Sequence, residues 1–136
     1  MNELIAKAIA VTELPDEEIF LISMYDNLEN PQDGIEFQKS LGEIDDQDRD
    51  LGMDSYCIST SFGSTVYGGL ASCVLNQTSL NLRFNPEEGK ILGFPDGLRI
   101  HLETDPTTTE ALRDGLARIF DQDRCSPAEL NLRSTK

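Results

Sequence analysis

The chain has 136 residues, a length typical of one domain that buries a core without needing a disulfide or a metal. Its formal net charge is −14, and residues 1–50 hold 14 acidic side chains against three basic ones. This charge argues against nucleic acid or an anionic membrane as a partner, because both are negative. It favours solubility and fast association with a basic protein.

The cysteines and the N-terminus indicate the compartment. Cys57, Cys73 and Cys125 form no CxxC pair, so they predict neither a zinc site nor a secreted disulfide scaffold. The N-terminus lacks the basic and apolar regions of a signal peptide, and no apolar run approaches membrane-spanning length. We therefore expect a cytoplasmic protein.

The N-terminal part is predicted to form strands. Leu4 to Val11 alternates at period two and is interpreted as one strand, although its alanines also suit a helix. Ile19 to Tyr25 is a nearly continuous apolar run, as expected for a central strand buried on both sides. Ile35 to Leu41 alternates again, with Ile35 and Phe37 on one side.

A meander of three strands is predicted next, from the runs Ser55–Phe62, Val66–Leu75 and Ser79–Phe84. Gly68 and Gly69 interrupt the second run. Paired glycines within a strand mark a bulge or a close backbone approach, or they leave room for a partner. The alternation predicts that the members of each set share one face of their strand, namely Tyr56, Ile58, Thr60 and Phe62, then Leu70, Ser72 and Val74, then Leu80, Leu82 and Phe84.

The C-terminal part contains the clearest helix. A short helical turn opens at Pro86, and Leu98–Leu102 is the last predicted strand. Asp105 supplies a cap, and an apolar stripe of helical spacing follows. The stripe consists of Leu112, Leu116, Ile119 and Phe120.

These elements predict an α+β fold. A mainly antiparallel sheet of about six to seven strands is covered by one C-terminal amphipathic helix. Residues 1–122 form a single domain, and residues 123–136 are predicted to be a loose polar tail.

The patterns for catalytic chemistry are incomplete. His101 is the single histidine, it lies on the polar side of its predicted strand, and no nucleophile motif accompanies it. A surface histidine is therefore favoured over a hydrolase built on His101 and a carboxylate, and no catalytic residue is predicted.

A calcium loop is matched only in part. Asp46, Asp48 and Asp50 have the spacing that begins such a loop, but Leu51 stands in place of its glycine and Cys57 in place of its closing glutamate. A small acidic calcium-binding module is the alternative to a protein-docking segment.

Several motifs occur in an order typical of one family. They are Gln47-Asp48, Leu51-Gly52-Met53-Asp54-Ser55-Tyr56, Tyr67-Gly68-Gly69-Leu70, Leu80-Asn81-Leu82-Arg83-Phe84 and the segment Ala111–Phe120. Over roughly Gln38 to Phe120 the chain resembles the immunity protein 10 family of bacterial polymorphic toxin systems. The resemblance implies a cytoplasmic, mainly β protein that binds and neutralises a toxin encoded beside it, with no enzymatic role and no cofactor.

The chain departs from the family pattern at two places. Ala71 stands where the family usually carries an acid, and Ile22–Asp26 replaces a Gly-Phe-Ala-Asp-Asp segment. A binding role that depends on those acids is therefore not carried over to this chain.

The predicted toxin-binding residues combine an acidic segment with two tyrosines that would act as anchors if exposed. They are Glu43, Asp45, Asp46, Asp48, Asp50, Asp54, Tyr56 and Tyr67. An acidic surface fits a toxin with a basic surface, such as the phosphate-binding cleft of a nuclease. No nucleic-acid or membrane partner is expected. A homodimer is an open alternative, because an exposed sheet edge could pair two copies of the chain.

Overall fold

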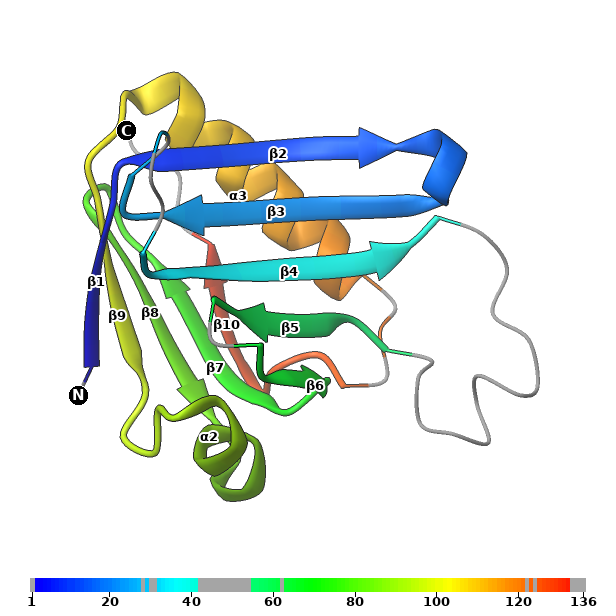
Figure 1. Ribbon diagram of the computed structural model, residues 1–136, viewed down its shortest axis with the longest axis vertical. Coiled ribbons are helices and arrows are strands. Elements are labelled where there is room, and N and C mark those ends of the chain that lie inside the picture. Colours follow the sequence, from blue (N-terminus) through cyan, green and yellow to red (C-terminus); the bar gives the residue numbers. More distant parts are fainter. Residues whose placement is uncertain are drawn as a thin grey trace.

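The computed structural model describes residues 2–27, 29, 32–41, 55–61, 63–121, 123 and 125–132. This part of the chain forms an α+β fold in which two five-stranded sheets face one another, with helix α3 packed on the core-facing side of one of them (Figure 1). The fold class is therefore confirmed, but the expectation of one sheet of six to seven strands is wrong.

Sheet A is mixed and has the strand order β1-β9-β8-β7-β10. Its outer strands β1 and β10 run parallel to their neighbours, whereas β7, β8 and β9 are antiparallel. Its strands are β1 (Asn2–Ala6), β7 (Leu70–Leu75), β8 (Ser79–Phe84), β9 (Leu98–Leu102) and β10 (Glu129–Leu132).

Sheet B is an antiparallel meander in chain order, β2-β3-β4-β5-β6. Its strands are β2 (Ala8–Leu14), β3 (Ile19–Tyr25), β4 (Gly34–Ser40), β5 (Cys57–Thr60) and β6 (Thr65–Tyr67). The 3-10 turn η1 (Pro15–Glu17) joins β2 to β3, and β4 ends at the same end of sheet B, where Ser40 pairs with Ile19.

The chain changes sheets at two short points. Lys7 separates β1 from β2, so the predicted strand from Leu4 to Val11 is in fact two strands in different sheets. Gly68 and Gly69, both with positive φ, carry the chain from β6 into β7 and divide the predicted second strand of the meander. The predicted three-stranded meander is thus two hairpins, one in each sheet.

Helix α3 (Pro106–Phe120) packs on β2, β3 and β4, on the side that faces the core. The side chain of Asp105 accepts a hydrogen bond from the backbone N–H of Thr108, as predicted for the cap. The predicted apolar stripe is confirmed, because Leu112, Leu116 and Ile119 are fully buried and Phe120 is 3% exposed. Helix α2 (Pro86–Leu92) ends at Gly93 and packs near β6 and β8.

Two further expectations need correction. A register shift between Leu70 and Ser72 breaks the alternation of β7, so Val74 is half-buried while Leu70, Ser72, Cys73 and Leu75 are buried, and Leu70, Ser72 and Val74 do not form one uniform face. Residues 129–132 form β10 on the edge of sheet A, so the expectation of a loose tail is wrong for them.

Strand β3 was expected to be buried on both sides, and it is buried on one. Phe20, Ile22 and Met24 are buried, but Ile19 and Leu21 alternate with them and are only half-buried. The apolar side chains on the second side of β3 therefore lie at a surface that the described part of this chain does not cover.

Neither α2 nor α3, the helices of the described part of the chain, is long and apolar enough to cross a membrane.

Candidate functional site

The structure separates the two tyrosines that the sequence offered as anchors. Tyr67 lies in β6 and is 40% exposed, whereas Tyr56 is fully buried just before β5. Exposure is needed for contact with a partner, so Tyr67 meets the condition and Tyr56 does not.

Tyr56 instead joins the C-terminal segment to the strands. Its hydroxyl accepts a hydrogen bond from the backbone N–H of Leu70 and donates one to the backbone oxygen of Cys125. Asp123 accepts bonds from the Ser55 hydroxyl and from the backbone N–H of Tyr56. Tyr56 and Asp123 thus fix the junction between the sheets, and burial raises the pKa of the Tyr56 hydroxyl.

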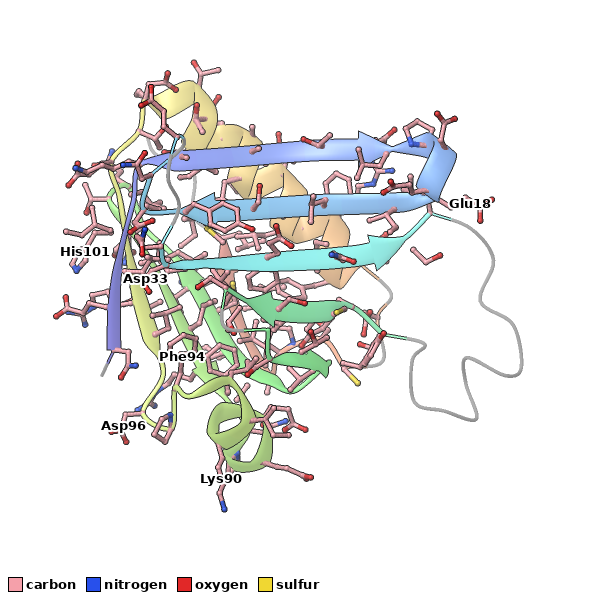
Figure 2. The ribbon with its side chains drawn as sticks, viewed as in Figure 1. Glu18, Asp33, Lys90, Phe94, Asp96 and His101 are labelled. Atoms are coloured by element: carbon pink, nitrogen blue, oxygen red, sulfur yellow. The ribbon has the colours of Figure 1, made fainter. Side chains whose placement is uncertain are left out.

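A groove of about 230 Å³ lies at the end of sheet B where β2 turns into β3. Its lining includes the carboxylates Glu17 and Glu18, the polar Gln38, and the side chains of Cys57 and Tyr67. Both carboxylates are exposed, and Figure 2 shows Glu18 projecting from the end of the hairpin. The groove therefore presents negative charge beside an exposed aromatic ring, a combination that suits a basic side chain of a partner.

Two basic residues of the described part of the chain, Lys39 in the lining of the groove and Arg118 of α3, have their charged groups bound at α3. The ammonium group of Lys39 donates to the backbone oxygens of Arg118 and Asp121 at distances of 3.0 and 2.8 Å. The guanidinium of Arg118 pairs with Glu13 and lies 4.5 Å from the centroid of the Phe20 ring. Their positive charge therefore stabilises the C-terminal end of the helix.

The predicted acidic segment lies outside the described residues. This applies to Glu43, Asp45, Asp46, Asp48, Asp50 and Asp54, and so to the calcium candidate as well. Among the described residues, no group of three or more His, Cys, Asp or Glu side chains could hold a metal ion. Ser40 and Ser55, which flank residues 42–54 closely in the chain, both line the groove.

Sequence reasoning missed Glu17 and Glu18 as candidate site residues. A signal was available, because in an antiparallel meander the β2–β3 turn and the β4–β5 connection lie at the same end of the sheet. The acids of residues 16–18 lie at the end of sheet B where β4 ends, and the acidic segment is the next part of the sequence after β4. Assigning the strands to one contiguous meander would have found them.

His101 contacts Glu3 at the surface. Its Nε2 lies 2.5 Å from Oε1 of Glu3, and the two side chains are 42% and 59% exposed. The hydrogen bond from His101 lowers the pKa of Glu3. Such an exposed pair joins β9 to β1 at the surface, in agreement with the predicted surface histidine (Figure 2).

None of the three cysteines forms a disulfide in the described part of the chain. Cys57 belongs to sheet B and Cys73 to sheet A, so the two do not face one another across a hairpin. Burial raises the pKa of Cys73 to about 12 and also raises the pKa of Cys57. Cys73 is thus a small buried apolar side chain with little thiolate at neutral pH.

We expect the thiols to differ in reactivity by at least about tenfold, because alkylation needs both access and thiolate. Cys57 and Cys125, which are half-buried, should react with iodoacetamide in the native protein, and Cys73 only after unfolding. Peptide mass spectrometry after timed labelling at pH 7.5 measures each rate. Labelling of native Cys73 as fast as Cys125 would contradict the burial of β7.

The comparisons with known proteins give one match. The family model of immunity protein 10 matches residues 5–110, beginning nearer the N-terminus than the motifs noted above and ending within α3. A search of curated proteins and a search of solved structures give no match. The chain belongs to the immunity protein 10 family, a non-catalytic family whose members neutralise cognate toxins.

Proposed function

We propose that this immunity protein acts in the cytoplasm by forming a protein–protein complex in which its acidic end binds a basic surface of the toxin. The observation that carries this proposal is the concentration of charge. Residues 1–50 carry 14 of the 25 acidic residues, and the exposed Glu17 and Glu18 line a groove whose walls adjoin the acidic segment in the chain. Complementary charge speeds the encounter and excludes partners of the wrong sign.

The binding residues proposed are Glu43, Asp45, Asp46, Asp48, Asp50 and Asp54 of the acidic segment, together with Glu17, Glu18 and Tyr67 of the groove. Tyr67 supplies the aromatic anchor, because Tyr and Arg side chains contribute most to binding when they are surrounded by weaker contacts. Tyr56 acts indirectly, by fixing the start of β5 from inside.

Co-expression tests the proposal directly. The chain is produced with the polypeptide encoded immediately beside its gene, and the complex is sought by co-purification while survival of the host is scored. A stable complex together with loss of the neighbour's toxicity supports the proposal. A neighbour that remains toxic and never co-purifies would overturn it.

Neutralising three aspartates of the acidic segment should slow association. The variant Asp46→Asn, Asp48→Asn, Asp50→Asn should bind about tenfold more slowly at low salt, and its association rate should depend less on salt. Stopped-flow fluorescence between about 20 and 300 mM salt gives both quantities.

A matched control keeps the same net charge. The variant Glu87→Gln, Glu103→Gln, Glu110→Gln removes three exposed acids from α2, the end of β9 and α3. It should retain most of the association rate. Equal rates for both triple variants would remove residues 46–50 from the interface and leave net charge alone as the cause.

A further inference from the structure

The outward side of sheet B lacks a covering layer. The inward side packs against α3 and sheet A, whereas in Figure 1 no described helix or strand lies over the opposite side. We call this opposite side the open face. It is defined by two rows of cross-strand neighbours that span all five strands of the sheet.

The first row of the open face is largely uncharged and apolar. It runs Thr12, Leu21, Gln38, Cys57 and Tyr67, from β2 to β6, and each residue pairs with the next. The two ends are exposed and the middle three are half-buried. Tyr67 and Gln38 also line the acidic groove, so the row leads directly into it.

The second row lies beside the first and carries small side chains. It runs Ala10, Ser23, Glu36, Ser59 and Thr65. Glu36 is the one charged member of either row, and it accepts a hydrogen bond from the Tyr25 hydroxyl. A protein in which 26% of residues are charged thus leaves the centre of one sheet face almost free of charge. Depletion of charge at the centre, with a charged rim, is the composition that distinguishes protein interfaces.

The sequence of β3 points the same way. Its continuous apolar run is typical of a strand covered on both sides, yet the described part of the chain covers only the side of Phe20, Ile22 and Met24. Leu21 in the first row and Ile19 beside the groove remain half-exposed. A partner that covers the open face would complete the burial that the sequence of β3 specifies.

We infer that the open face of sheet B is the toxin-binding surface, with its uncharged rows at the centre of the interface and Glu17, Glu18 and Tyr67 at its acidic end. This inference rests on the proposed function and adds to it the surface of the protein that contacts the toxin. The partner surface that fits is flat and weakly charged opposite the two rows, with Lys or Arg side chains opposite Glu17 and Glu18. The cognate toxin is the occupant, since the family exists to bind it.

Charges placed on the open face test this assignment. The variant Thr12→Arg, Thr65→Arg puts one cation on each edge strand of sheet B, β2 and β6, at exposed positions. Opposite a flat, weakly charged partner surface, burial of unpaired arginines should weaken binding about 100-fold or more, measured as Kd against the polypeptide encoded beside the gene. The control variant Thr78→Arg, Ala111→Arg adds the same charge at exposed positions of the β7–β8 turn and of α3, and should bind within about threefold of the unaltered chain.

A second measurement uses the unaltered open face. Cys57 belongs to the first row, so bound toxin should slow its alkylation at least about tenfold, while a reference thiol introduced as Thr78→Cys in the β7–β8 turn should react at its free rate. This readout does not depend on whether an arginine variant folds. If added toxin leaves the Cys57 rate unchanged, the open face is not the interface.

The outcomes separate the two claims. Binding by the unaltered chain, loss of binding by Thr12→Arg, Thr65→Arg and protection of Cys57 support the inference. Equal binding by that variant and by the control overturns the inference alone. Absence of binding by the unaltered chain overturns the proposed function and the inference with it. Protection of Cys57 by increasing concentration of the chain without toxin would assign the face to a second copy instead, and would overturn the inference.

Discussion

Replacing Phe120 with alanine is expected to lower the free energy of unfolding by about 3–5 kcal/mol, the usual cost of removing a buried phenylalanine ring. Phe120 is 3% exposed at the end of α3, and its ring packs edge-to-face against Tyr56 and Phe37 at centroid distances of 5.1 and 6.3 Å. The loss combines burial, a residual cavity and two aromatic contacts. Urea denaturation followed by circular dichroism measures it.

The exposed apolar residue Ile91 provides the control for this prediction. Ile91 is 50% exposed on α2, so Ile91→Ala should change stability by no more than about 0.5 kcal/mol. A loss below about 1 kcal/mol for Phe120→Ala would mean that the end of α3 does not close the core. Because Phe120 is buried, we expect Phe120→Ala to reduce toxin binding only in proportion to the fraction of protein that is unfolded.

The Phe120 prediction begins from the apolar pattern of a single helix. A helical period needs only local information, since each apolar residue recurs on the same side of one continuous element. The spacing of Leu112, Leu116, Ile119 and Phe120 is therefore enough to assign them to the core, and all four are buried. The same holds for Leu98, Ile100 and Leu102 of β9, which alternate over a single uninterrupted strand.

The division into two sheets could not be predicted in this way. Period two tells which side of a strand faces the core, but it does not tell which sheet the strand joins. At Lys7 the chain changes sheet and the inward side changes parity, because Leu4 and Ala6 face inward from β1 whereas Ile9 and Val11 face inward from β2. Strand β10 was missed because its four residues are too few, and too polar, to establish a period.

The acidity of the N-terminal part was visible in the sequence, but the positions of Glu17, Glu18 and the open face were not. The excess of acids in the first 50 residues is visible in the composition, and it indicated a basic partner. The open face was hidden because Ile19 and Leu21 suggested a covered strand, and only the fold shows that the cover is absent from the described part of the chain. A strand that is apolar on both sides but covered on only one suggests a partner for the other side. The sequence pattern alone indicates that both sides are covered, but it does not tell what covers them.

Replacing Gly68 with alanine is expected to cost about 2–5 kcal/mol. Gly68 has φ +70°, a conformation in which an alanine loses about 1–2 kcal/mol. An added Cβ would also lie 2.8 Å from both Cβ and Sγ of Cys125, and relieving such an overlap in a packed region costs about 1–3 kcal/mol more. The contact matters because the backbone of Cys125 accepts the hydrogen bond of buried Tyr56.

Gly93→Ala isolates the backbone part of that loss. Gly93 has φ +84° and open space around its Cα, so its alanine variant should lose only the about 1–2 kcal/mol that the conformation costs. The double variant Gly68→Ala, Cys125→Gly removes the overlapping atoms and should regain part of the difference, which a double-mutant cycle in urea measures. If Gly68→Ala and Gly93→Ala cost the same, the steric contact contributes nothing, and Gly68 serves only the turn between the two sheets. If the cycle shows coupling, the C-terminal segment and the β6–β7 junction form one packed unit, which holds Tyr67 and the end of the open face in place.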